Sequence, residues 1–304
     1  MLTRIDYEGI SWVDLQSPSP EDIERISNEF ELHPLVVEEL GRPSFRPKAE
    51  NFGGHLYLIL HLPIYDFQSR QRRSRELDLV VGKNFLLTVH YDAISAVSEF
   101  FRSCELSLAL RTRLFQETSL GLLSVLWERL YENLLAEMDH IQRKIDRIED
   151  RIFAGQEEEL IEDISLLRRD ILDFSRAVRP HDTVLESLSN MGLAFFGEEF
   201  THCHNELSGR YRRIMTLIRN HKDTLETLYD TNDSLLTHRS NEIIKTLTML
   251  ALLTFPLTLI ASIFSIEAAA LPIVGQPNDF WIILGIMIVT VLAMLTFFRH
   301  RRWI

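Results

Sequence analysis

Two long runs without a charged residue near the C-terminus constrain this chain more than any other feature. Residues 246–266, TLTMLALLTFPLTLIASIFSI, and residues 280–298, FWIILGIMIVTVLAMLTFF, contain no Asp, Glu, Lys or Arg. An α-helix needs about 20 apolar residues to cross roughly 30 Å of hydrocarbon, and each run reaches that length. The two runs therefore predict two transmembrane helices joined by a short loop at residues 267–279.

The charges that flank these runs predict their orientation. Lys245 precedes the first run, and Arg299, Arg301 and Arg302 follow the second, whereas residues 267–279 contain no Lys or Arg. Lys and Arg are enriched in the cytoplasmic loops of membrane proteins. We therefore expect a multi-pass protein of the cell (inner) membrane with both termini in the cytoplasm and the loop outside.

The composition narrows the classes of function. The 304 residues carry a net charge of −12, which argues against nucleic acid as a partner. An acidic balance is compatible with the handling of cations, but it also simply keeps many proteins soluble. The sequence has no phosphate-binding loop, no nucleophile motif and no HExxH, so we do not expect an enzyme.

Residues 1–105 have the pattern of an α+β cytosolic domain, expected as α/β/α layers. Residues 10–15, 55–65 and 76–91 are rich in β-branched and aromatic residues and are bounded by turn formers, which predicts strands. The segment SPEDIERISNEF predicts a helix, with Ser19 as its N-cap and Pro20 in its first turn.

From about residue 106 the spacing of apolar residues becomes helical. Two seams with alternating spacings of three and four flank the segment FAGQEEE, which predicts an antiparallel helical hairpin with its break near Gly155. The seams are Leu134, Met138, Ile141, Ile145, Ile148 and Ile152, then Leu160, Ile164, Leu167, Ile171, Phe174 and Val178.

A third helical stretch leads into the first apolar run. No proline occurs between Pro180 and Pro256, and the apolar spacing continues across the boundary. One helix is expected from near Phe200 to Ile266, on the order of 100 Å long at 1.5 Å per residue. The expected domains are thus the α+β domain at 1–105, a long-helix stalk at 106–245 and a membrane region at 246–304.

Several segments, in this order, are similar to segments of the CorA family of divalent-cation transporters. They are WVDL at 12–15, LHPLVVEEL at 32–40, RPKAE at 46–50, LTVH at 87–90, SNEIIKTLTMLALLTFPLTLIASIF at 240–264 and RHRRW at 299–303. The resemblance covers almost the whole chain. It implies a homopentamer in a lipid bilayer, whose first spans line a pore for the passive entry of Mg²⁺ or another divalent cation. It also implies gating by cytosolic cations bound between subunits.

The chain departs from the family at the outer end of the first span. The family has Tyr-Gly-Met-Asn there, whereas this chain has Phe264, Ser265, Ile266 and Glu267. The resemblance places Ser265, Ile266 and Glu267 at the external mouth, where a ring of carboxylates would concentrate cations. The other reading is that Glu267 is only an interfacial residue. The departure leaves the ion open: Mg²⁺ is the family default, and Co²⁺, Zn²⁺ and Ni²⁺ are alternatives.

The residues after Ile266 also predict a longer helix. The segment EAAAL is a strong helix former, unlike Gly-Met-Asn, so we expect the helix to continue for about one turn past Ile266.

The resemblance selects a pore face, a basic collar and two sensing residues. The pore face has an alternative reading as ordinary helix packing, and the collar has one as contact with lipid headgroups. The alternative interpretation of the sensing residues is that they are ordinary solvent-exposed acidic residues of a long helix. The segment HCHNE, residues 202–206, suggests a zinc site as a further alternative. The pore face is Asn241, Ile244, Leu247, Ala251, Phe255, Thr258 and Ser262; the collar is Lys245, Arg299, Arg301 and Arg302; the sensing residues are Glu206 and Asp230.

Two functions from different classes therefore stand. The first is a pentameric channel for divalent cations. The second is a non-conducting sensor or regulatory homologue that has kept the fold, which the altered Ser-Ile-Glu segment and Phe255 in the pore would suit.

Overall fold

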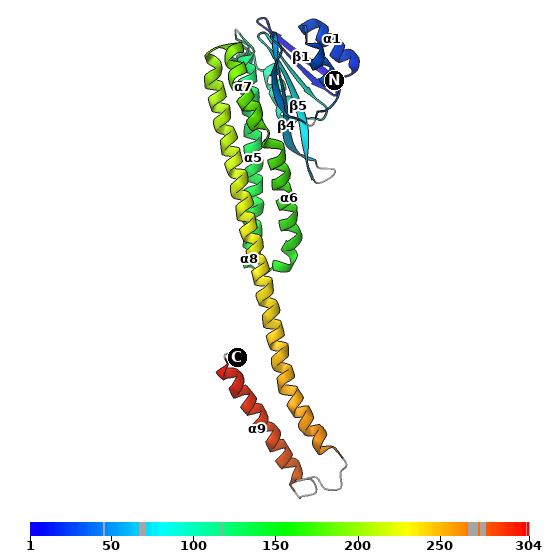
Figure 1. The fold of residues 1–304 in the computed structure, drawn as a ribbon, viewed down its shortest axis with the longest axis vertical. Coiled ribbons are helices and arrows are strands. Elements are labelled where there is room, and N and C mark those ends of the chain that lie inside the picture. The colour runs from blue at the N-terminus through cyan, green and yellow to red at the C-terminus, as the bar shows by residue number, and fades with distance from the viewer. Residues whose placement is uncertain are drawn as a thin grey trace. The chain divides into compact units, whose positions relative to one another are not determined.

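The computed structural model describes all of residues 1–304 except 45, 67–70, 117, 267–272, 274–277, 302 and 304. The chain divides into two compact units, Met1–Tyr229 and Asp230–Ile304. Figure 1 shows the fold. The described strands are β1 (Leu2–Tyr7), β2 (Ile10–Gln16), β3 (Lys48–Asn51), β4 (His55–Asp66), β5 (Gln71–Gly82) and β6 (Phe85–His90).

Helices make up most of the remaining chain. They are α1 (Pro20–Phe30), α2 (Pro34–Glu39), α3 (Ser95–Leu106), α4 (Leu108–Leu114), α5 (Leu120–Phe153), the 3₁₀ turn η1 (Glu157–Glu159), α6 (Leu160–Val178), α7 (His181–Phe196), α8 (Glu199–Phe264) and α9 (Asp279–His300).

The six strands form one sheet in the order β1-β2-β6-β5-β4-β3. Neighbouring strands are antiparallel, except that β2 and β6 are parallel, with Val13 opposite Leu87. A parallel pair requires a crossover connection, and here α1, α2 and three strands lie between the two partners in the chain. The predicted strands at 10–15, 55–65 and 76–91 are confirmed.

Helices cover both faces of this sheet. On one face, α1 and α2 contribute Ile23, Ile26 and Val36 to a core that includes Tyr57 and Val80 of the sheet. On the other face, Trp12 is fully buried beside two phenylalanine rings of α3, with centroid distances of 5.1 and 4.9 Å. The expected α/β/α layering is therefore confirmed.

The start of α1 follows the predicted cap. Ser19 Oγ accepts a hydrogen bond from the Asp22 amide, and the Asp22 carboxylate accepts one from the Ser19 amide. Two amide groups that have no partner within the helix are satisfied in this way. The local sequence thus sets the N-terminus of α1.

The predicted helical hairpin is formed by α5 and α6. Every residue of the two predicted seams is buried, and the chain reverses at Gly155, whose φ of 85° is one that residues with a Cβ rarely adopt. In Figure 1 these helices and the first part of α8 extend away from the sheet. The pattern of threes and fours therefore marks the core of the first unit.

A single 66-residue helix, α8, runs from Glu199 to Phe264 and contains Pro256 in its interior. This confirms the predicted long helix, but its outer end differs from the expectation. The amide of Ser265 reaches the carbonyls of Ala261 and Ser262, and Ile266 lies in a bend. The expected continuation past Ile266 is therefore wrong, because the helix already ends at Phe264 and local helix propensity is only a weak preference. Residues 267–270, which the extra turn would occupy, lie outside the described residues.

The second unit holds the two predicted spans. By length and composition, α8 and the stretch Phe280–His300 of α9 are each able to cross a membrane, and none of the apolar window of either helix is buried within the chain. Their side chains therefore need lipid or further protein as an environment.

Candidate functional site: the exposed stripe of α8

The seven residues assigned to the pore face share one side of α8. At about 100° per residue they fall within about 120° of the helix circumference, so one stripe carries them all. All except Ala251 are exposed, and Phe255 is exposed to 72 %. The described part of the chain therefore leaves this stripe uncovered. The stripe is Asn241, Ile244, Leu247, Ala251, Phe255, Thr258 and Ser262.

Polar groups on the stripe have oxygens available. The hydroxyl of Thr258 donates to the carbonyl of Thr254 at 2.9 Å, and the hydroxyl of Thr254, which lies just off the stripe, donates in the same way to the carbonyl of Leu250 at 3.0 Å. Since each hydroxyl hydrogen is held by the backbone, the oxygen lone pairs remain free to accept. Such oxygens suit the water shell of a hydrated cation, since Mg²⁺ usually keeps several of its waters.

Apolar side chains interrupt these oxygens along the stripe. Ile244 and Leu247 are exposed to 57 % and 60 %, and Phe255 projects the largest side chain of the seven. Rings of apolar side chains can close a pore by excluding water. The stripe thus has groups that favour a hydrated cation at its two ends and an apolar block that opposes one between them.

Pro256 lies directly beside this stripe. Proline has no amide hydrogen, so the carbonyl of Leu252 receives no helical hydrogen bond from position 256. The helix nevertheless continues to Phe264. In a membrane, such a carbonyl needs a neighbouring helix, a side chain or water, which is consistent with a helix packed among others.

The external-mouth residues are only partly described. Ser265 and Ile266 are exposed and follow the last turn of α8. Glu267 lies outside the described residues, so its assignment stays a prediction.

The residues of the basic collar lie at the ends of the two spans. Lys245 on α8 is 3.6 Å from Glu242, one turn earlier. Arg301, just after α9, places its guanidinium 5.9 Å from the Phe297 ring centroid. Trp303 stacks on Phe298 at 5.9 Å, which folds the tail back against the end of α9. Arg299 is in the last turn of α9, and Arg302 lies outside the described residues.

The two predicted sensing residues are not brought together within one chain. Glu206 is bound by Arg210 at 3.2 Å, and Arg210 also pairs with Glu128 and Glu132 of α5. Asp230 is exposed, roughly 36 Å further along the same helix. Within the described ranges, no group of three or more His, Cys, Asp or Glu residues is arranged to hold a metal ion. Both assignments therefore stay predictions.

Within one chain, residues 202–206 do not form the set of ligands that a zinc site would need. The Cys203 sulfur accepts a hydrogen bond from Ser124 at 2.8 Å, and burial raises the pKa of its thiol. His204 Nε2 lies 2.9 Å from the carbonyl of Leu185. Both side chains point into the protein, away from the face that carries His202 and Glu206, as their spacing on a helix predicts.

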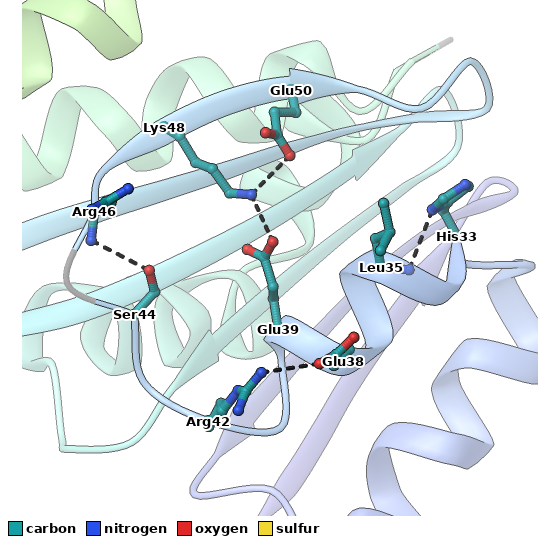
Figure 2. A network of polar contacts seen from close by, with 9 residues as sticks. All are labelled: His33, Leu35, Glu38, Glu39, Arg42, Ser44, Arg46, Lys48 and Glu50. Atoms are coloured by element: carbon teal, nitrogen blue, oxygen red, sulfur yellow. Dashed lines mark hydrogen bonds and ion pairs between the residues drawn. The ribbon is translucent and has the colours of Figure 1, made fainter.

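An ionic network that the sequence analysis did not anticipate joins α2 to β3. Figure 2 shows the ammonium of Lys48 between Glu39 and Glu50, at 2.8 Å from each carboxylate, and Arg42 bound to Glu38 at 3.0 Å. Burial alone would lower the pKa of Lys48, but the two carboxylates raise it above its ordinary value. The network joins side chains from the segments LHPLVVEEL and RPKAE. The sequence shows only that these segments are close together along the chain.

Comparisons with known proteins agree with this arrangement. Residues 7–301 match the profile of the family described as CorA-like Mg²⁺ transporter protein. The chain is 23 % identical over 303 residues to the cobalt/magnesium transport protein CorA of Thermotoga maritima, with 98 % of this chain and 85 % of the relative covered. It is also 19 % identical to the zinc transport protein ZntB of Yersinia enterocolitica, with 96 % and 88 % covered.

Solved structures show the same fold. The complete structure of the CorA magnesium transporter from Methanocaldococcus jannaschii matches with a TM-score of 0.83 at 20 % identity, over 99 % of this chain and 94 % of that one. The full-length CmaX protein matches with a TM-score of 0.77 at 17 % identity, over 97 % and 89 %. Since the family profile spans nearly the whole sequence and the complete fold agrees, this chain belongs to the CorA-like Mg²⁺ transporter family.

Proposed function

We propose that the protein is a homopentameric channel for divalent cations in the cell (inner) membrane, with both termini in the cytoplasm. The observation that carries this proposal is the uncovered stripe on the outer part of α8, where an apolar stretch from Ile244 to Phe255 lies between Asn241 on one side and Thr258 and Ser262 on the other. Copies of this chain arranged around an axis would turn each stripe position into a ring, and α9 would pack outside.

Mg²⁺ is the first candidate ion, and Co²⁺, Zn²⁺ and Ni²⁺ are alternatives. The curated relatives include a cobalt/magnesium protein and a zinc protein, so the family name alone does not select the ion for this chain. The proposed flow is passive, and cations bound on the cytosolic side would gate it. Carboxylates such as Asp230 are candidates for that binding, because hard divalent cations prefer oxygen ligands.

Glu267 is the residue on which the choice of ion depends in this proposal. Five carboxylates at the outer mouth would raise the local concentration of cations through their summed charge. Replacing Glu267 with Gln or Asn removes that charge with little change of size. We expect lower flux at low cation concentration in both variants and an altered ratio between Mg²⁺, Co²⁺ and Zn²⁺.

The test is cation uptake into liposomes that contain the purified full-length protein. Wild type, Glu267→Gln and Glu267→Asn are compared with Leu250→Ala, which truncates an exposed residue of α8 that lies off the stripe. Phe255→Ala should increase flux, because it removes the largest side chain from the stripe. Equal flux and selectivity in wild type and both Glu267 variants would reject the role of Glu267.

A non-conducting cation sensor of the same fold is the second candidate. The observation that favours it is the bulky exposed ring of Phe255 on the stripe, which would narrow the path in five copies. Absence of uptake for every ion in the wild type, with a pentamer confirmed by native mass spectrometry, would reject the channel and leave this function.

A further inference from the structure

A buried carboxyl group in the cytosolic unit has no role in the ion path. Asp78 on β5 is fully buried, and its register partners are Ile59 on β4 and Val89 on β6. Both partners belong to the apolar core that Val36 and Leu40 complete from the α2 side. Asp78 therefore lies in the apolar layer between the sheet and α2.

A second carboxyl group stands next to Asp78 on the same face. Glu76 is two residues earlier on β5, and its side chain is only 7 % exposed. Its Oε2 accepts a hydrogen bond from the Ser44 amide at 2.6 Å, whereas Oε1 has no hydrogen-bond partner among the described residues. The same holds for both oxygens of Asp78 and for the hydroxyl of Tyr57.

The basic side chains near this pair are already engaged. Lys48 from β3 is held by Glu39 and Glu50, as Figure 2 shows. The Nε2 of His61, opposite Glu76 on β4, donates to the carbonyl of Ser44 at 2.9 Å and lies 3.6 Å from Glu76 Oε2.

Arg176 of α6 lines the same cavity as Glu76, together with Asp92 and Asp173, and is paired with Asp173 at 3.1 Å. The remaining titratable groups that influence the pair add no positive charge. They are the hydroxyls of Tyr57 on β4 and Tyr91 after β6, and the carboxylate of Glu39 on α2. Two ionised carboxylates side by side in an apolar layer would repel each other and lack the solvation of water. One bound proton removes one charge and supplies a hydrogen-bond donor between the two carboxyl groups, in addition to the nearby hydroxyl of Tyr57.

We propose that Asp78 keeps a proton at neutral pH beside Glu76, and that loss of this proton at alkaline pH loosens α2 from the sheet. Solvent reaches the pair from the Glu76 side, because Glu76 lines a cavity of about 430 Å³ together with Ser44, His61 and Tyr91. The proton thus couples the stability of the cytosolic unit to pH. This inference does not depend on the proposed channel.

The direction of the effect follows from linkage. Burial, followed by the adjacent Glu76, raises the pKa of Asp78 well above its ordinary value. Between the pKa in the unfolded chain and the raised pKa in the folded chain, the folded state binds more protons. The contribution of the pair is therefore fully present at acid pH and is lost as the pH rises.

The test is thermal unfolding of the full-length protein in detergent from about pH 5 to about pH 9, for wild type and Asp78→Asn. Asparagine is neutral at every pH and donates a hydrogen bond, so it mimics the protonated carboxyl. We expect Tm to fall more steeply with pH in wild type, by about 3 °C for each pH unit of full linkage. Glu24→Gln, on the exposed side of α1, should follow wild type.

The comparison with Asp78→Asn isolates the pair from another alkaline effect. Burial alone would lower the pKa of His90, but its hydrogen bond and charge interaction with Asp14 raise it. His90 therefore also contributes stability that is lost as the pH rises, but it is present in both proteins. Parallel curves for wild type and Asp78→Asn would overturn the proposal.

Infrared spectroscopy provides a direct readout of the proton, even if Asp78→Asn does not fold. The wild type should show a protonated-carboxyl C=O band at about pH 7 that disappears at higher pH. In Glu76→Gln the band should disappear at a lower pH, because the neighbouring negative charge is gone. A wild-type spectrum without the band, or an unchanged pH of its loss in Glu76→Gln, would overturn the proposal that Asp78 holds this proton. Stabilisation by Mg²⁺ that Asp78→Asn abolishes would assign the pair to a metal ion instead.

Discussion

His181 should make the protein acid-sensitive, and replacing it with Gln should remove that sensitivity. His181 begins α7 and is completely buried. Its Nε2 donates to the carbonyl of His61 on β4 at 2.9 Å, and its Nδ1 lies 3.3 Å from the Tyr131 hydroxyl on α5. Because a carbonyl can only accept, Nε2 carries the hydrogen and the neutral ring accepts at Nδ1.

The expected magnitude follows from the pKa of this ring. Burial lowers the pKa of His181 to about 4, from an ordinary value of 6.5. The folded state therefore binds fewer protons than the unfolded state between these values, and stability is lost as the pH falls through them. At 1.36 kcal/mol per unit, the loss at pH 4 approaches about 3 kcal/mol. For a unit of this size, that corresponds to a fall in Tm on the order of 10 °C.

Thermal unfolding followed by circular dichroism measures this effect. Wild type and His181→Gln are compared in detergent between about pH 4 and about pH 8, with His202→Gln, an exposed histidine of α8, as the matched control. The Tm of wild type should fall towards that of His181→Gln or below it as the pH decreases. If the gap between the two proteins is the same at both ends of the range, His181 does not titrate as argued.

Two further substitutions test the packing and the capping of helices in the first unit. Gly192→Ala places a methyl group against the ring of Phe200, which is only 1 % exposed. We expect the free energy of unfolding, measured in urea, to fall by about 1–3 kcal/mol. In Gly209→Ala the added methyl group meets open space, so the free energy of unfolding should instead rise by up to about 1 kcal/mol. Equal effects of the two would contradict the packing argument. Ser19→Ala removes the side-chain acceptor for the Asp22 amide and should cost about 1 kcal/mol by the same assay, whereas Ser19→Thr should be nearly neutral.

Features governed by local periodicity could be predicted from the sequence. The seams of α5 and α6 repeat every three or four residues, and each residue in them is buried. The charge-free runs and the proline-free approach to them likewise predicted α8 and α9. The stripe was selected by the family resemblance, and the spacing of its residues on a helix implies that they share one face.

The prediction for the outer end of α8 failed because it relied on propensity alone. Preferences of about a few tenths of a kcal/mol per residue are only a weak prior, which the surrounding structure routinely overrides. The amide of Ser265 is shared between Ala261 and Ser262, and the helix ends at Phe264.

What the sequence by itself determined is the main strands and the long helices, where the apolar spans occur, and which face of the hairpin helices is apolar. Only the tertiary structure decided which elements meet: β2 beside β6, Lys48 between two carboxylates, and His181 against the backbone of β4. Asp78 is the clearest case, because alternation along β5 places it on a face with Glu76, and that face becomes buried only through its partners on β4, β6 and α2. The physical reason is that periodicity shows on which face of its own helix or strand a residue lies. Whether that face is buried, and which charges lie next to it, depends on pairing between segments far apart in the chain.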